Sequence, residues 1–370
     1  MTVVRGQLVV DGAVEFGELS IEDGLITDAA LLPDAPPDAP FLAPGFVDVH
    51  VHGWGGHSAM GDRVALDGMS RALLRRGVTS FLPTAITAPL DVLTEFAARV
   101  RDWLPYTPDD GAEPLGFNLE GPFLADARRG AQDPTHLRVP TNVPRDDLAG
   151  LLESCRLITV APELPGALEL IAWLDSQGVR ASIGHSAATF EQARSGYAAG
   201  ATTTTHLFTA MSGVDHRSPG VALAALLTDE AYVEMIADGV HVALELWPLV
   251  LRLKAADRLI LVSDAIPLTG TGDGRGKLGS LDIEIHGERV TLTGTDTLAG
   301  SALSLDKAVR NLVDSGVAMP VAVAAASTNP LAMLGITDRG RLAAGQRADL
   351  VELDATLNVS RVMRAGEWVS

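Results

Sequence analysis

The middle of the chain alternates between short apolar runs and longer stretches with the spacing of amphipathic helices. Eight short runs are expected to be strands: 46–52, 78–85, 115–120, 156–161, 179–185, 201–206, 233–238 and 259–264. Helices fit between them, for example at 66–76 and 90–104, and Leu305, Val309 and Leu312 keep helical spacing after the eighth run. Eight strand–helix units over about 290 residues predict an α/β fold, a (β/α)8 TIM-like barrel. An open doubly wound sheet uses the same units, so the count favours the barrel without excluding the alternative.

The two ends of the chain have a different pattern, with short strands separated by turns. The strands expected there cover 3–10, 17–21, 25–27, 348–353 and 361–369. Neither end can bury a core alone, so we expect one small β-sandwich domain built from both chain termini, residues 1–45 plus 340–370. The barrel of residues 46–339 is then inserted between the two parts. Two short runs around a His-Gly turn predict a β-hairpin insertion near 278–296.

Ionisable side chains stand at the carboxyl ends of five of the eight predicted barrel strands. They are His50 and His52 on the first strand, Glu120 on the third, His185 on the fifth, His206 on the sixth and Asp264 on the eighth. All strands of such a barrel open on one face, which carries the active site. Taken singly, the histidines also fit exposed or core positions, and the carboxylates also fit helix caps or salt bridges. Together they predict a metal site, because imidazole and carboxylate are favoured ligands of zinc and other divalent first-row ions.

Asp264, in the stretch Ser263-Asp264-Ala265, is expected to have a different role from the ligands. A metal-bound water has its pKa lowered to about 7, yet it still needs a base to take its proton and pass it to the leaving group. A carboxylate beside the metal can do both. The structural alternative is a buried aspartate that caps a helix.

Composition and charge narrow the class of protein. The chain has 370 residues with 28 basic and 47 acidic side chains, a net charge of −19, and 47% hydrophobic residues, as in a soluble globular protein. The acidic excess, without a cluster of Lys and Arg, argues against nucleic-acid or membrane partners. The single cysteine, Cys155, excludes an intrachain disulfide framework and fits a reducing compartment. With no signal-like start and no long apolar run, a cytoplasmic enzyme is expected.

Several stretches of the chain together resemble a known family. They are residues 44–53, 119–122, 184–186, 205–211, 217–220, 237–241, 263–265, 298–301 and 345–350. This set is similar to the amidohydrolase superfamily and, within it, to the N-acetylglucosamine-6-phosphate deacetylases. The His-x-His pair and the Gly-Gln-Arg-Ala-Asp-Leu tail are typical of the superfamily. The LEGP, THLF-x-AM and DGxH stretches are more specific to the deacetylases.

The resemblance implies a set of metal ligands. Glu120, His185 and His206 would hold the main divalent ion, and His50 and His52 would permit a second ion with Glu120 bridging the two. Some members of the family lack the His-x-His pair and use one ion, so one or two ions remain open. Zinc is the first candidate, with iron, manganese and cobalt as alternatives.

The resemblance also implies residues that contact the substrate. Arg217 matches a phosphate-binding arginine that reaches across a dimer interface, which implies a homodimer, and His241 matches a substrate-contacting histidine. From the sequence alone, Arg217 is equally a surface arginine and His241 a loop histidine. A bidentate guanidinium does suit a phosphate group.

Two positions depart from the family pattern near the expected substrate. Gln132 stands where the family has a histidine that polarises the acetyl carbonyl, and His136 is a possible substitute four residues later. Thr209, before Ala210, replaces an asparagine near the phosphate. A glutamine amide donates a hydrogen bond but carries no charge. These two departures leave the residues expected to carry out hydrolysis intact. They weaken the inference that the substrate is N-acetylglucosamine-6-phosphate in particular.

The resulting hypothesis is metal-dependent hydrolysis of an N-acetyl amino-sugar phosphate, with N-acetylglucosamine-6-phosphate giving glucosamine-6-phosphate and acetate. Asp264 would take a proton from the attacking water and return it to the departing nitrogen. Deacetylation of N-acetylgalactosamine-6-phosphate or of another N-acyl substrate is the first alternative. A non-catalytic sugar-phosphate-binding protein is the alternative from a different class.

Overall fold

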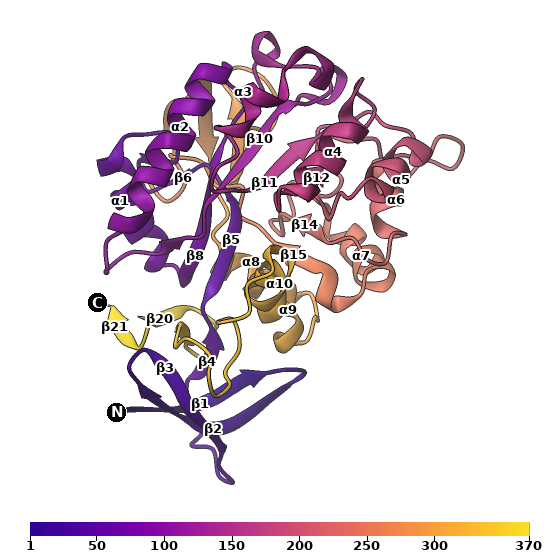
Figure 1. Ribbon diagram of the computed structural model, residues 1–370. Helices are drawn as coiled ribbons and strands as arrows, with labels where there is room; N and C mark the ends of the chain where they lie inside the picture. Colours follow the sequence, from indigo (N-terminus) through magenta and orange to yellow (C-terminus); the bar gives the residue numbers. More distant parts are fainter. Residues whose placement is uncertain (370) are drawn as a thin grey trace.

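The computed structural model describes residues 1–369, and its central feature is a barrel of eight parallel strands (Figure 1). The strands are β5 (Phe46–Val51), β8 (Val78–Ala85), β10 (Phe117–Phe123), β11 (Cys155–Val160), β12 (Arg180–Ile183), β13 (Thr203–Thr204), β14 (Val233–Met235) and β15 (Leu259–Leu261). The first six of these strands form one continuous parallel sheet in the order β13-β12-β11-β10-β8-β5, and β14 pairs with β15. Backbone hydrogen bonds join the two parts: the Tyr232 amide donates to the Thr202 carbonyl (2.9 Å), and the Asp264 amide donates to the His50 carbonyl (2.9 Å). The predicted α/β barrel is therefore confirmed.

Helices surround the outer side of this barrel (Figure 1). They are α1 (Arg63–Leu74), α2 (Leu90–Trp103), α3 (Arg145–Ala149), α4 (Ala167–Ser176), α5 (Phe190–Ala198), α6 (Val221–Leu226), α7 (Trp247–Leu253), α8 (Leu305–Asp314), α9 (Met319–Ala326) and α10 (Thr328–Leu334). Helix α1 illustrates why they pack there. Leu66, Met69 and Leu73 recur at helical spacing and are buried, and the Asp62 carboxylate caps the helix by accepting from the Ala65 amide (2.9 Å).

Short elements complete the connections around the barrel. The 3₁₀ turns are Leu104–Tyr106, Asp126–Arg128, Pro134–His136, Pro140–Asn142, Leu244–Leu246 and Ala256–Arg258. Strands β6 (Gly53–Trp54) and β7 (His57–Ser58) form a small hairpin, and β9 (Glu113–Pro114) pairs with β8. In the part of the chain that the structure covers, no helix has both the length and the apolar character to span a bilayer.

The two ends of the chain meet in one seven-stranded sheet at the end of the barrel where β5 begins (Figure 1). Its order is β21-β20-β19-β4-β1-β2-β3, with β1 (Thr2–Val10), β2 (Ala13–Glu22), β3 (Leu25–Leu31), β4 (Phe41–Pro44), β19 (Leu350–Leu353), β20 (Val359–Arg364) and β21 (Glu367–Val369). Leu8, Leu19, Ile26, Leu350 and Met363 belong to a small core of its own. This sheet supports our proposal that both ends form one domain, although Ser370 lies outside the described residues.

A three-stranded antiparallel sheet follows the eighth barrel strand. It consists of β16 (Gly274–Leu278), β17 (Leu281–His286) and β18 (Arg289–Leu292), and its buried Ile283 and Val290 pack with Ile86 and Ile266 from the barrel loops. The sequence indicated the β17–β18 hairpin but not β16. That strand reads Gly-Arg-Gly-Lys-Leu and buries only Leu278, so it lacks the alternating apolar pattern that marks a strand.

Several barrel strands end earlier than the apolar pattern suggested. His185, His206 and Asp264 lie just beyond β12, β13 and β15, and all three have positive φ angles of 47°, 27° and 50°. Residues other than glycine adopt this region rarely, at a cost of about 1–3 kcal/mol each, and such residues cluster at functional sites. The chain thus leaves the sheet at the residues with the candidate chemistry.

Candidate active site

One buried carboxylate lies at the centre of four imidazole rings at the carboxyl end of the barrel. Glu120 Oε1 is 2.9 Å from the Nε2 atoms of His185 and His206 and 3.5 Å from His50 Nε2. Its other oxygen, Oε2, is 3.3 Å from His52 Nε2. These residues come from four barrel strands or the segments that follow them, and all are buried. The structure therefore brings together all five residues that the sequence singled out as ligands.

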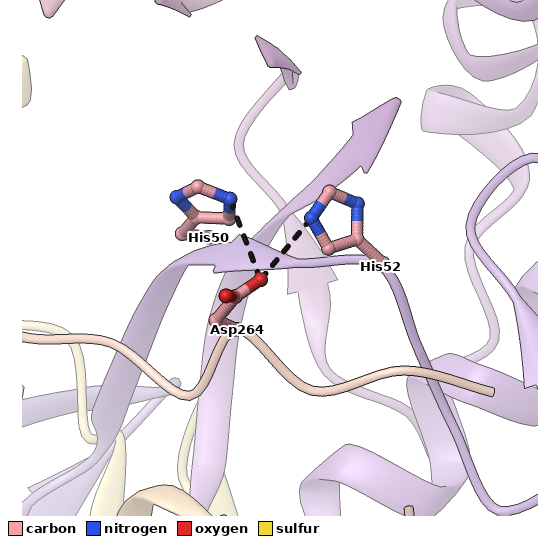
Figure 2. A group of neighbouring side chains, drawn as sticks. All are labelled: His50, His52 and Asp264. Carbon is pink, nitrogen blue, oxygen red and sulfur yellow. Dashed lines mark ion pairs between the residues drawn. The ribbon is translucent and has the colours of Figure 1, made fainter. Parts of the chain in front are cut away.

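Asp264 lies against the His-x-His pair at the same end of the barrel. Figure 2 shows its carboxylate below the two rings, with Oδ1 3.2 Å from His52 Nε2 and 3.7 Å from His50 Nε2. The Ser301 amide donates to the Asp264 carbonyl (2.8 Å), which helps to fix the turn. Gly300 packs so closely here that a Cβ atom would lie 2.8 Å from that carbonyl oxygen. Asp264 is thus held with its carboxylate facing the histidines.

The outer nitrogens of three rings are held by acceptors, which turns Nε2 of each ring toward the centre. His52 Nδ1 is 3.1 Å from the Thr84 carbonyl, and His185 Nδ1 is 3.0 Å from the Arg128 carbonyl. His50 Nδ1 instead faces the carboxylate of Glu234 at 3.2 Å. Histidines that bind metals are typically oriented in this way by a carbonyl or carboxylate on the other nitrogen.

The donor set fits one or two divalent ions. His50, Glu120 and His206 offer ligand atoms within 4.8 Å of one another, and so do His50, His52 and Asp264. Among the described atoms, His50 Nε2 is buried without a hydrogen-bond partner. Neutral imidazoles and carboxylates with inward-facing lone pairs are the ligands that zinc and related ions prefer.

The oppositely charged groups of the cluster shift one another's pKa values in the direction that favours the charged forms. Burial opposes ionisation of Glu120, but His185 and His50 outweigh it and hold the pKa of this carboxyl well below its usual range. Burial also disfavours a charged His52, yet its hydrogen bonds to Asp264 and Glu120 raise the pKa of His52 to about 9. Burial acts against the charged form of Asp264 as well, and His52 and His50 still lower its pKa. These shifts favour the cationic form of His52 and the anionic forms of Glu120 and Asp264.

Metal binding to this cluster is expected to release protons. A metal ligand must be a neutral imidazole, so the ion displaces the proton that His52 holds below pH 9. Apparent metal affinity should rise with pH, by about tenfold per pH unit for each proton displaced, because the pKa values of both His50 and His52 are raised. Calorimetric titrations of metal-free protein in buffers of different ionisation enthalpy measure that proton count. Equal affinity at pH 7 and pH 9, without proton release, would show that the histidines of the cluster are already neutral at pH 7.

The candidate cavity joins the ligand cluster to residues expected to contact substrate. It is lined by His52, Glu120, Gly130, Ala131, Gln132, His185, His206, Thr209, Ala210, His241, Asp264, Leu278, Leu298 and Gly300. Arg217 is not among them. It lies in an exposed loop, where its Nε donates to His216 Nε2 (3.0 Å). Within a single chain, the structure brings the other expected substrate residues together but leaves Arg217 outside the cavity.

Gln132 and His241 are both fixed by hydrogen bonds in this cavity. Gln132 Nε2 donates to Glu120 Oε2 (2.6 Å), while its Oε1 accepts from the Thr87 amide (2.9 Å). The amide is therefore directed at Glu120. His241 Nδ1 is 2.7 Å from Asp238 Oδ2, and despite its burial this contact lowers the pKa of Asp238. That pairing leaves Nε2 of His241 available to a ligand.

Residue-by-residue reasoning from the sequence missed some residues that support the site. Glu234 is fully buried and contacts the His50 ring. The sequence feature that could have pointed to it is a charged residue within the apolar run of β14. Asp238 had been noted only as part of a matching stretch, without a role. His136, the possible substitute for the missing histidine, does not line the cavity and lies 3.7 Å from Asp133.

Comparisons with known proteins agree with this geometry. A model of the amidohydrolase family matches residues 41–369. The chain is 37% identical to an N-acetylgalactosamine-6-phosphate deacetylase of Escherichia coli O157:H7, over 99% of this chain and 98% of the relative. It is 38% identical to the N-acetylglucosamine-6-phosphate deacetylase of Homo sapiens, over 89% of this chain and 83% of the relative.

Solved structures of similar proteins share the whole architecture. The N-acetylglucosamine-6-phosphate deacetylase of Thermotoga maritima superposes with a TM-score of 0.93 at 33% identity, covering 100% of this chain and 99% of that one. A Mycobacterium smegmatis enzyme of the same name superposes with a TM-score of 0.91 at 36% identity, again covering 100% of this chain and 99% of that one. That structure has an aspartate replaced by alanine and N-acetyl-D-glucosamine-6-phosphate bound.

Proposed function

The chain belongs to the amidohydrolase family, and from this premise we propose that it hydrolyses the acetamide of an N-acetyl amino-sugar phosphate. The preferred substrate is N-acetylglucosamine-6-phosphate, with glucosamine-6-phosphate and acetate as products. One observation carries the proposal: four imidazoles surround Glu120 while Asp264 lies beside them in the same cavity. This arrangement joins a metal-binding donor set to a carboxylate that can transfer protons.

Glu120, His185 and His206 would hold the first divalent ion, and His50 and His52 would hold a second. Zinc is the expected ion, with iron, manganese and cobalt as alternatives for a histidine–carboxylate site. When bound, the metal supplies a Lewis acid that activates water and polarises the acetyl carbonyl.

Asp264 supplies the proton transfers of the proposed reaction. Its lowered pKa keeps the carboxylate ionised, so it can take a proton from the attacking water as the new C–O bond forms. It then gives this proton to the amide nitrogen as the C–N bond breaks, because an amide nitrogen is a poor leaving group until it is protonated. The products are acetate and the free amine.

The remaining cavity residues orient the substrate. His241, held by Asp238, presents Nε2 to a polar group of the sugar phosphate, and Thr209 and Ala210 line the wall beside it. Gln132 holds Glu120 in place. Because Arg217 lies outside the cavity of its own chain, we propose that it serves the phosphate of a second copy in a homodimer. The lone cysteine supports a cytoplasmic location within this proposal.

The N-acetylgalactosamine-6-phosphate reaction is the second candidate. The Escherichia coli O157:H7 relative of that name is 37% identical along 98% of its length, and the glucosamine enzyme of Thermotoga maritima is 33% identical along 99% of its length. Gln132 and Thr209 also depart from the pattern of the glucosamine enzymes. The two sugars differ in configuration at one hydroxyl, so a direct comparison of turnover can separate them.

The test is acetate release by the metal-loaded protein from a panel of substrates. N-acetylglucosamine-6-phosphate, its galactosamine isomer, unphosphorylated N-acetylglucosamine and an N-acetyl amino acid form the panel. We expect turnover of at least one phosphorylated sugar and much slower turnover of the unphosphorylated one. Tight binding of the phosphorylated sugars without acetate release, at full metal occupancy, would favour a binding protein instead.

A further inference from the structure

Glu234 is a buried carboxylate inside the barrel that the proposed reaction does not use. It lies on β14, and its side chain has no exposed surface. Burying a carboxylate in a barrel core costs desolvation free energy unless hydrogen bonds or opposite charges compensate it. An apolar side chain of similar size would pack there without that cost. Its contacts therefore indicate its role.

A single oxygen atom of Glu234 touches two of the candidate metal ligands. Oε2 is 3.2 Å from His50 Nδ1 and accepts from the backbone amide of His206 at 3.3 Å. The other oxygen, Oε1, is buried and has no hydrogen-bond partner among residues 1–369. Glu234 thus links a ligand on β5 to the ligand that follows β13, across the interior of the barrel.

His50 differs from the neighbouring ligands in the partner of its outer nitrogen. His52 and His185 place Nδ1 against neutral backbone carbonyls, whereas His50 places Nδ1 against a carboxylate. A carboxylate fixes the same ring orientation as a carbonyl does and also makes the imidazole a more basic ligand. In the proposed assignment His50 and His52 hold the second ion, with Asp264 beside them, so the basicity of His50 affects whether that ion can bind.

We propose that Glu234 is a positioning residue that holds His50 and, through its charge, gives the His50–His52 half of the site its affinity for a second ion. The inference deepens the proposed function and rests on it for the identity of the ligands. A merely structural role, in which Glu234 only braces the turn at His206, would need the hydrogen bond but not the charge.

The Glu234→Gln variant separates the charge from the hydrogen bonds. Both bonds are accepted by Oε2, so the glutamine oxygen can take that position and keep them. The amide nitrogen then occupies the Oε1 position, where the native residue makes no hydrogen bond. Glu234→Leu removes the charge and both bonds. Glu352→Gln, a glutamate in β19 that pairs with Arg361 in the terminal sheet, is the matched control.

Metal binding is measured on metal-free protein without substrate, by calorimetry with Zn²⁺ and by the visible spectrum of bound Co²⁺. We expect two ions per chain in the native protein and in Glu352→Gln. Glu234→Gln should bind the first ion with unchanged affinity and the second about 10- to 100-fold more weakly. Thermal unfolding of the metal-free variants checks that the fold is retained.

Three results would overturn the inference. Native protein that binds only one ion would show that the His50–His52 half-site does not exist. Equal weakening of both ions in Glu234→Gln would indicate a structural role, and unchanged binding of both ions would show that the charge has no effect. None of these readouts depends on acetate release, so failure of the proposed reaction is detected separately by the substrate panel.

Discussion

Replacing Asp264 by asparagine is expected to lower kcat by about 100- to 10,000-fold, the range that a positioned general acid–base contributes. Asparagine has nearly the same shape, so it keeps the packing beside His52 and the turn fixed by Ser301. It cannot take a proton from water or give one to the amide nitrogen. The loss should therefore appear in kcat, while the ion that we propose is held by Glu120, His185 and His206 stays bound.

The measurement pairs acetate release with metal content for each variant. Asp282→Asn, an exposed aspartate that pairs with Lys277 on the insertion, is the matched control and should keep the native rate. An Asp264→Asn protein with native turnover would remove Asp264 from the mechanism. A variant that loses all its metal together with activity would instead assign Asp264 mainly to ligation.

Glu120→Gln is expected to weaken metal binding by more than about 100-fold, and turnover should fall with it. Residues that only orient ligands change metal affinity by about 10- to 100-fold, and Glu120 lies at the centre of the proposed ligand set itself. Its oxygens are 2.9 Å from His185 and His206 and accept a hydrogen bond from Gln132 at 2.6 Å. A glutamine either turns its amide nitrogen toward Gln132, placing two donors face to face, or turns it toward the histidines.

Metal content after dialysis and acetate release at added metal test this second expectation. Glu352→Gln again serves as the control, since it removes one glutamate charge far along the chain in the terminal sheet. High concentrations of metal should restore part of the Glu120→Gln activity if weakened binding is the cause. Native metal content together with native turnover would exclude Glu120 as the central ligand.

Much of the barrel could be predicted because parallel strands carry a strong apolar signal. The strand over residues 78–85 matches β8 at both ends, and that strand is buried throughout. The strands predicted to end in His206 and Asp264 were predicted too long, because β13 ends at Thr204 and β15 at Leu261 while the apolar and β-branched pattern runs on past both points. Strand β16 escaped detection because glycines and charges replace its apolar positions.

The ligand cluster could be predicted for a geometric reason. Carboxyl ends of parallel barrel strands converge, so residues at those ends meet although they are far apart in sequence. The contacts beneath them could not be predicted in this way. The pairing of Glu234 with His50 crosses the barrel interior, and it depends on how far each strand is shifted relative to the others. Likewise, the sequence alone could not tell that Gln132 turns its amide toward Glu120.

The seven-stranded terminal sheet has a consequence for how the protein is made. Strand β4 ends at Pro44, but its partner β19 begins only at Leu350. At ribosomal speeds of about 5–20 residues per second, roughly 15 to 60 s separate the two strands during translation. Throughout that interval the open edge of β4 has no native neighbour, and unpaired strand edges attract strands of other chains. The nascent polypeptide is therefore most exposed to aggregation before β19 emerges, and a truncation that removes β19 should yield insoluble protein.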